Sequence, residues 1–259
     1  MPTGLRWERS DSGRIFRRFE RSTGETVVVH APINFYEDFL GGVVGTGHVV
    51  PDGLGLALGS TPGTGAYTAN GVNGTFKLTS GAASGTYSAD GVMLNFPQLN
   101  FTPSTLYDLN LEVKLKMLSA VTTATMGVGF TDVASATGSM EEPSSIATAT
   151  LTTNATDGFG VIYDTGATSA KFHVWGVAND VDSVFYNTGV APVAATNNII
   201  RLQISNGLVG KAWIDGVLVK EQSAVVTTAI PLTPYVYVNS TTTTARAIEI
   251  DYIRVWAAR

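Results

Sequence analysis

The chain has 259 residues and a mass of 27.2 kDa, with 44% hydrophobic and 14% charged residues and a formal net charge of −5. This balance excludes an intrinsically disordered chain and supplies enough apolar material for a core. The absence of cysteine excludes disulfides and thiolate metal sites. No apolar stretch approaches the roughly 20 residues of a transmembrane helix, and no signal-peptide core follows Met1, so we expect no export by the general secretory route.

Turn formers and strand formers dominate the composition. Gly, Thr, Ser, Ala and Val are plentiful, whereas long helix formers are scarce. A single all-β sandwich can reach this length. We therefore predict an all-β fold, an antiparallel β-sandwich over residues 36–259, preceded by an N-terminal arm or hairpin over residues 1–35.

The first thirty residues differ from the rest in charge. They hold six Arg and four acidic residues, a net charge of +2 in a chain of net charge −5. Residues 14–21 and 26–30, separated by a turn-like Ser22–Glu25, predict a β-hairpin. It is either an extra strand pair of the sandwich or an arm that attaches the protein to a neighbour, since Arg and aromatic residues are enriched in interfaces. Nucleic acid is the weakest option because acids interleave the arginines. The predicted interaction residues are Arg6, Trp7, Arg14, Phe16, Arg17, Arg18, Phe19 and Arg21.

The sandwich is predicted to start with a strand over residues 35–42. Frequent Asp-Gly and Asn-Gly pairs between residues 41 and 91 indicate short strands and tight turns. The clearest strand runs from Leu109 to Met117, where apolar and polar residues alternate strictly. This pattern predicts one buried and one exposed face. The polar stretch over residues 132–156 predicts a long surface loop.

The last sixty residues predict an antiparallel meander. A strand over residues 199–205 runs into Asn206–Gly207, and Asp215–Gly216 divides the next hairpin. The final strand, residues 247–256, is partly apolar on both faces, which predicts a central position in a sheet.

This C-terminal pattern resembles the concanavalin A-like lectin/glucanase jelly roll. The resemblance is carried by the Asn206–Gly207 turn, the Trp213–Val219 hairpin and the closing Ile250–Val255 strand. It implies a jelly-roll sandwich. It does not imply one function, because lectins, glycosidases and viral structural proteins share the fold.

Catalysis in glycosidases of this fold would require paired carboxylates on one strand, spaced Glu-x-Asp-x-x-Glu. The nearest match starts with Glu249 and Asp251 but ends with Arg254, so the acid/base is missing. We expect both acids to be structural, paired with Arg246 or Arg254. We predict no catalytic residues and no enzyme.

The other candidate groups are also isolated. Adjacent Glu141 and Glu142 would point apart in an extended chain, and His30, His48 and His173 lack metal-ligand spacing. We predict no metal and no cofactor.

Two further signals are weak. Residues 179–182 offer oxygen donors for Ca²⁺ but lack the dense acidic spacing of such a site, so a plain turn is expected. Trp175 and Trp213 are candidates for stacking against sugar rings, and burial is the alternative for each.

The succession of motifs from residue 125 to residue 256 also resembles a group of tailed-bacteriophage virion proteins. It includes Phe159–Thr168, Phe172–Val177, Thr188–Val193 and the Asp251–Ile253 ending. The resemblance implies a structural role, as a capsid decoration protein or a fibre component assembled in host cytoplasm. On this hypothesis the partners are capsid or other virion proteins, the assembly is a homotrimer, and neither membrane nor nucleic acid is bound. The alternatives are a carbohydrate-binding adsorption module and, as a minor option, a glycoside hydrolase.

Overall fold

The computed structural model describes residues 6–9, 15–19, 26–30, 33–40, 53–61, 63–68, 74–82, 90–96, 101–103, 108–118, 121–133 and 142–257. These residues form antiparallel strand ladders, with a short 3-10 turn at Val121–Thr123. The all-β prediction is confirmed. Among the described residues, no helix has the length and apolar character needed to cross a membrane.

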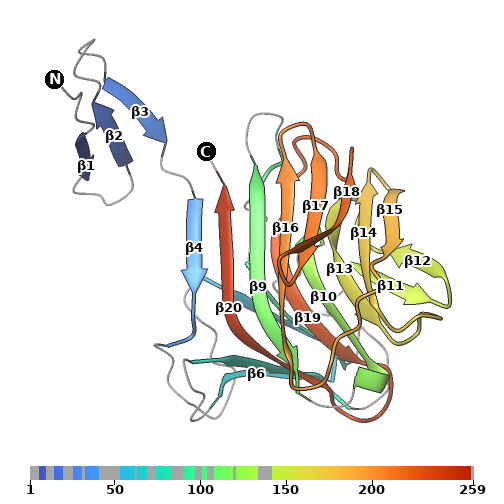
Figure 1. Cartoon of the computed structure of the whole chain (residues 1–259). Helices are drawn as coiled ribbons and strands as arrows, with labels where there is room; N and C mark the ends of the chain where they lie inside the picture. The colour runs from blue at the N-terminus through green and yellow to red at the C-terminus, as the bar shows by residue number, and fades with distance from the viewer. Residues whose placement is uncertain are drawn as a thin grey trace.

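Two sheets packed face to face form the sandwich (Figure 1). The first is seven-stranded, and its strands in spatial order are β15 (Val181–Asn187), β14 (Phe172–Ala178), β13 (Gly158–Asp164), β10 (Ala124–Thr131), β19 (Thr233–Ser240), β8 (Val92–Asn95) and β5 (Gly55–Leu58).

The second sheet has eight strands. Along its main path they are β18 (Val217–Gln222), β17 (Val209–Ile214), β16 (Asn197–Ser205), β9 (Leu109–Met117), β20 (Ala247–Ala257), β7 (Phe76–Thr79) and β6 (Thr64–Tyr67). The eighth, β4 (Ile33–Glu37), pairs with the C-terminal half of β20.

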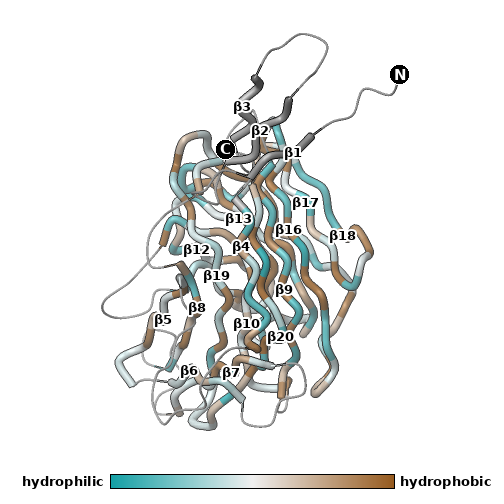
Figure 2. Tube along the Cα trace, turned by 90° about the vertical axis from the view of Figure 1, so that its left-hand side faces the viewer, coloured by the Kyte–Doolittle hydropathy of each residue, from teal (hydrophilic) through white to brown (hydrophobic). Residues whose placement is uncertain are grey.

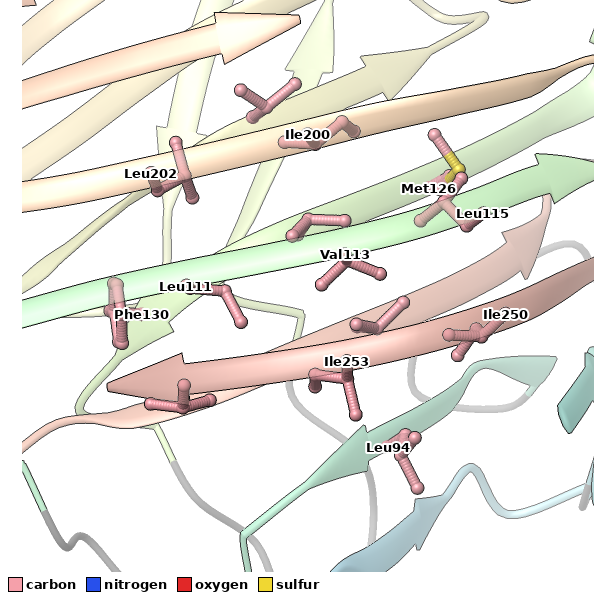
Figure 3. Close-up of a cluster of buried hydrophobic side chains, with 14 of the residues drawn as sticks. Leu94, Leu111, Val113, Leu115, Met126, Phe130, Ile200, Leu202, Ile250 and Ile253 are labelled. Atoms are coloured by element: carbon pink, nitrogen blue, oxygen red, sulfur yellow. The ribbon is translucent and has the colours of Figure 1, made fainter. Parts of the chain in front are cut away.

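The main core lies between the sheets. In β9 the apolar set from Leu109 to Met117 is buried at every second position, as its alternation predicts. Figure 2 shows hydrophilic and hydrophobic residues alternating along β9, β16 and β20. In Figure 3, Val113 belongs to one buried cluster with Met126 and Phe130 of the other sheet. Since side chains alternate across a strand, the remaining residues of each strand face outward.

The closing strand, β20, is central between β9 and β7/β4, as predicted, but for another reason. A bulge between Ile250 and Tyr252 shifts the register by one residue. Ile248 and Ile250 before it, and Ile253 and Val255 after it, therefore all point into the same core. The two-sided apolar pattern results from this bulge, not from burial of both faces.

Both predicted hairpin turns are present. Asp215 (φ 51°) and Gly216 (φ 80°) form a two-residue turn of the kind that Asp-Gly favours. After Asn206 the positive φ angles fall at Gly207 and Leu208, so this loop has three residues.

The prediction of a surface loop over residues 132–156 is wrong for the part of the stretch that the structure describes. Its described part contains a hairpin of β11 (Ser144–Ala147) and β12 (Thr150–Thr153), with Ile146 and Leu151 opposite each other and both buried. Its polar composition hid these apolar anchors, which are buried against the sheet next to them.

At the N-terminus, three strands form a small sheet of their own: β1 (Arg6–Arg9), β2 (Ile15–Phe19) and β3 (Thr26–His30). The predicted hairpin corresponds to β2 and β3, and β1 adds a strand. Of the predicted arm residues, Arg6 and Trp7 lie in β1, Phe16, Arg17, Arg18 and Phe19 lie in β2, and Arg14 and Arg21 lie outside the described residues. The strand predicted for residues 35–42 is β4, which starts at Ile33 and ends at Glu37.

Candidate functional site

The outer face of the seven-stranded sheet, turned away from the main core, carries aromatic rings laid on glycines. A Cβ added to Gly127 would lie 2.2 Å from Cε1 of Tyr237, and one on Gly158 would lie 2.6 Å from Cη2 of Trp175. Only glycine lets the rings approach the strands this closely. We call this set the glycine-floored face: Gly127, Gly129, Gly158, Gly160, Trp175, Tyr235 and Tyr237.

Two polar atoms converge over the centre of this face. A Cβ on Gly160 would meet Nε1 of Trp175 at 2.8 Å and the hydroxyl of Tyr235 at 3.0 Å. Burial raises the pKa of Tyr235, and the nearby indole opposes part of that shift. Even so, neither atom makes a hydrogen bond of good geometry.

The β11–β12 hairpin covers the glycine-floored face. Ile146, Leu151 and Ala155 pack with the rings into a second buried cluster, separate from the main core. Trp175, Tyr235 and Tyr237 are consequently 0% exposed. Figure 1 places β11 and β12 next to β13 and β14.

Hydrogen bonds fasten the hairpin to the end of β13. The carboxylate of Asp164 accepts from the backbone N–H of Ile146 (2.9 Å) and of Gly166 (2.8 Å). Thr148 adds two backbone bonds, donating to Gly166 O (2.9 Å) and accepting from Thr168 N–H (2.6 Å). Asp164 is therefore held in a fixed orientation at one end of the glycine-floored face.

Buried polar atoms without partners gather between the hairpin and this face. A buried polar atom without a hydrogen bond costs about 1–3 kcal/mol, so a cluster of them calls for an explanation, and a bound polar group would supply one. Among the described residues, six such atoms come from five side chains here: Glu142 Oε2, Ser144 Oγ, Trp175 Nε1, Tyr235 OH, and both Nδ2 and Oδ1 of Asn239.

Glu142 is the ionisable group of this cluster, 2% exposed. Burial raises its pKa well above the ordinary value; the hydrogen bond with Tyr237 opposes the shift and the charge of Asp164 adds to it. The Tyr237 hydroxyl lies 2.5 Å from Glu142 Oε1 and 3.1 Å from Ser144 O. The Tyr237 hydroxyl donates to Glu142 Oε1, and this bond favours the ionised carboxyl while burial favours the protonated one. Glu142 is thus a buried carboxyl with a raised pKa and a fixed orientation.

His173 and Phe185 lie on the same face toward its β15 edge. Their rings stack with centroids 5.3 Å apart, and Phe185 is 38% exposed. Burial lowers the pKa of His173, whose Nδ1 lies 2.9 Å from Lys171 O. The histidine is an aromatic partner here and not one of a ligand set.

The two tryptophans named as candidates for stacking on sugars lie on opposite sheets. Trp175 belongs to the glycine-floored face and is fully buried, so a sugar reaches it only if the hairpin moves. Trp213 is half-buried on the outer face of the eight-stranded sheet, with the guanidinium of Arg201 4.9 Å from its ring centroid.

The acids of the closing strand fit the structural role predicted for them, with different partners. Glu249 pairs with Lys116 (3.0 Å) and Asp251 with Lys114 (2.7 Å), in place of the predicted arginines. Glu249 also accepts a hydrogen bond from the Thr75 hydroxyl.

The described residues contain no group of three or more acidic or histidine side chains placed to hold a metal ion. Asn179 and Asp180 both have positive φ and form the turn between β14 and β15. His48, Glu141 and residues 134–140 lie outside the described residues.

Comparison with solved structures identifies the architecture. An endo-β-1,4-glucuronan lyase from the fungus Trichoderma reesei matches with a TM-score of 0.55 at 12% identity, over 86% of this chain and 94% of that one. An endo-1,3-β-glucanase from Streptomyces sioyaensis matches at 0.53 and 11% identity, over 86% and 95%. The carbohydrate recognition domain of Emp47p matches at 0.53 and 10% identity, over 86% and 94%. The fold is the concanavalin A-like lectin/glucanase jelly roll.

No protein-family model and no curated protein matches the sequence. At these identities the jelly roll alone is shared. The predicted fold is confirmed, whereas the resemblance to phage virion proteins stays a prediction.

The prediction that the chain is not an enzyme is wrong as an inference from this fold. The matched jelly rolls are mostly glucanases and a lyase, so the fold fits enzymatic activity. The prediction relied on the lack of two carboxylates at a fixed spacing within one strand. That test cannot detect a pair such as Glu142 and Asp164, which come from different elements.

Sequence reasoning dismissed Glu142 because it follows Glu141 in a polar stretch. One signal was available: after Pro143, Ser144 and Ile146 are spaced two residues apart, as residues on one face of a strand are. Only the hairpin geometry shows that Glu142 points at Tyr237, 95 residues away.

Proposed function

We propose that this jelly roll acts on carbohydrate and takes a saccharide at the glycine-floored face, with Glu142 as proton donor. The observation that carries the proposal is the cluster of six buried, unpartnered polar atoms between the β11–β12 hairpin and the aromatic rings. Saccharides offer both requirements of such a surface, hydroxyls for polar atoms and apolar ring faces for aromatic rings. Entry requires the hairpin to move aside, because it buries all three rings.

The chemistry follows from the two carboxyl groups. Cleavage of a glycosidic bond needs an acid to protonate the leaving oxygen, and an acid of raised pKa suits this role. Burial gives Glu142 that property. Asp164 accepts hydrogen bonds from two backbone N–H groups that fix its orientation, and a carboxylate there would stabilise the positive charge that develops on the sugar ring until water adds to it.

The test is a panel of soluble polysaccharides, with binding followed by calorimetry and cleavage by release of reducing ends. Glu142→Gln keeps the shape of the side chain and removes the acid, and we expect it to bind while losing about 100-fold or more in rate. Glu221→Gln is the matched control, since Glu221 is exposed in β18 and pairs with Lys211 on the other sheet. Full activity of Glu142→Gln, or no saccharide bound by the unaltered protein, would contradict the proposal.

A second candidate function is assembly on a phage particle through the N-terminal sheet. It is favoured by the separate β1–β3 sheet, whose strands carry Arg and aromatic residues and pair only with each other among the described strands. Light scattering of the full chain and of a chain starting at Asn34 tests it. We expect a closed oligomer for the first and a folded monomer for the second; two monomers of equal melting temperature would rule out self-assembly through this sheet.

A further inference from the structure

Planar side chains line up on the outer face of the eight-stranded sheet, opposite the site described above. Cross-strand register places Trp213 beside Arg201, Arg201 beside Glu112, and Glu112 beside Arg254. Arg254 in turn lies beside Tyr36 of β4. We call the six planar members the planar strip: Tyr36, Arg201, Trp213, Tyr252, Arg254 and Trp256. With strands spaced about 4.8 Å apart, the row crosses five strands and spans roughly 19 Å.

The members of the strip contact one another. The Arg201 guanidinium lies 4.9 Å from the ring centroid of Trp213 and 5.5 Å from that of Trp256. Arg254 lies 4.7 Å from Trp256 as well. Beyond them Tyr252 and Tyr36 pair with centroids 5.9 Å apart. These contacts hold the planar groups in fixed positions before any ligand arrives.

The strip is accessible to a partner. Tyr36 is 55% exposed, Arg254 is exposed, and both tryptophans are half-buried. A surface that combines exposed aromatic faces with guanidinium groups is suited to a ligand with flat apolar faces and anionic groups.

Among the described residues, the two arginines of the strip lack ion-pair partners, whereas the lysines next to the strip have them. In the neighbouring positions, Lys114 and Lys116 each pair with a carboxylate of β20. Within the part of the chain that the structure describes, neither Arg201 nor Arg254 forms an ion pair. Arg201 Nε is buried without a hydrogen-bond partner. Two guanidinium groups are therefore available to anionic oxygens.

The one carboxylate among them is already engaged. Glu112 accepts a hydrogen bond from the Tyr252 hydroxyl at 2.9 Å. It lies between the two arginines in the register, so the local positive charge is modest. A densely charged phosphate backbone gains little from such a field, whereas a chain with widely spaced carboxylates fits it.

We propose that the planar strip binds an acidic polysaccharide, with uronate carboxylates on Arg201 and Arg254 and sugar faces on Trp213 and Trp256. This site is on the sheet opposite the glycine-floored face and does not depend on it. The chain would thus hold a charged polymer on one sheet, whatever reaction occurs on the other.

The test measures binding of the full chain to polyglucuronate, to the same polymer with its carboxylates reduced to alcohols, and to single-stranded DNA. We expect polyglucuronate to bind and the reduced polymer to bind about tenfold more weakly or less, because charge-assisted hydrogen bonds are the stronger ones. Arg254→Gln and Trp213→Ala should each weaken binding by a similar factor. Lys211→Gln, which removes one positive charge from β17 outside the strip, should change it less than about twofold.

Three results would overturn the proposal. They are equal loss in Lys211→Gln and Arg254→Gln, equal binding of the charged and reduced polymers, or tighter binding of DNA than of polyglucuronate. Far-UV and near-UV circular dichroism of each variant shows whether it is folded. If Arg254→Gln does not fold, Arg254→Lys takes its place. Loss of cleavage in Glu142→Gln tests the glycine-floored face, whereas loss of polyglucuronate binding in Arg254→Gln tests the planar strip, so the two proposals can fail separately.

Discussion

Replacing Gly127 by Ala tests whether the rings of the glycine-floored face lie where the structure places them. The new methyl would lie 2.2 Å from Cε1 and 2.8 Å from Cδ1 of Tyr237. Gly127 lies in β10, opposite Ile162 of β13 on one side and Tyr237 of β19 on the other. Because both neighbouring strands hold it, its backbone cannot yield. The ring must therefore leave its position, and with it the hydroxyl contacts to Glu142 and Ser144 O.

The size of the effect follows from two contributions. Overpacking a well-packed site costs about 1–3 kcal/mol, and leaving the buried Glu142 carboxyl without its partner costs about 1–3 kcal/mol more. A total of about 2–6 kcal/mol is a large part of the ~5–15 kcal/mol that stabilises a typical domain. At ~2–4 °C per kcal/mol, the melting temperature should fall by roughly 10 °C.

Urea unfolding and differential scanning calorimetry would measure this change in the single variant and in a double-mutant cycle with Tyr237→Ala. Once the ring is gone, Gly127→Ala should cost less than about 1 kcal/mol, so the coupling energy should be large. If Gly127→Ala costs the same with and without the Tyr237 ring, or does not lower the melting temperature at all, then the ring does not lie on the glycine.

Three further predictions concern the rest of the sandwich. Stability should fall as pH rises from about 4.3 toward the raised folded pKa of Glu142, because the folded state there holds a proton that the unfolded chain has lost. Glu142→Gln should remove this fall in pH-dependent urea unfolding, while His173, whose pKa is lowered, keeps its opposite slope in both proteins; equal pH profiles would contradict the assignment. Val113→Asp should abolish folding, since Val113 is 0% exposed and an unpaired buried charge costs several kcal/mol; an unchanged melting curve by circular dichroism would mean that β9 does not face the core. Asp215→Ala should cost about 1 kcal/mol, because it removes the 2.7 Å hydrogen bond from Ile199 N–H and puts at positive φ a residue that tolerates it less well than Asp. Asp215→Asn should cost less, since Asn can keep part of both. Equal midpoints of the two variants in chemical denaturation would refute this reasoning.

Local sequence patterns correctly predicted the strands and turns whose geometry is not altered by pairing with neighbouring strands. The alternation of β9 and the Asp215–Gly216 turn depend on side-chain period and on backbone preference, and both are present in the structure. The β20 bulge is different. One extra residue at Asp251 puts Ile250 and Ile253 on the same face, and nothing within the strand indicates it, because the bulge is set by pairing with β9.

The candidate site was largely invisible to sequence reasoning. Glu142 lies in a Ser/Thr-rich stretch that indicated a loop, and its partner Tyr237 is on a strand far along the chain. Gly127 and Gly160 leave room for a neighbouring group to approach the backbone closely. What approaches them, the rings of Tyr237 and Trp175, depends on which strands become neighbours.

The sequence by itself determined the fold class, the antiparallel meander of the C-terminal part and the buried face of β9, because these follow from side-chain period and turn preference within a few residues. Tertiary structure alone decided which surfaces carry chemistry. Sheet order placed Trp213, Arg201 and Arg254 in one row across the eight-stranded sheet. The folding of β11–β12 over the other sheet desolvated Glu142 and raised its pKa. Both effects arise between residues distant in the chain, where burial and pairing are set by the whole sandwich and not by any local pattern.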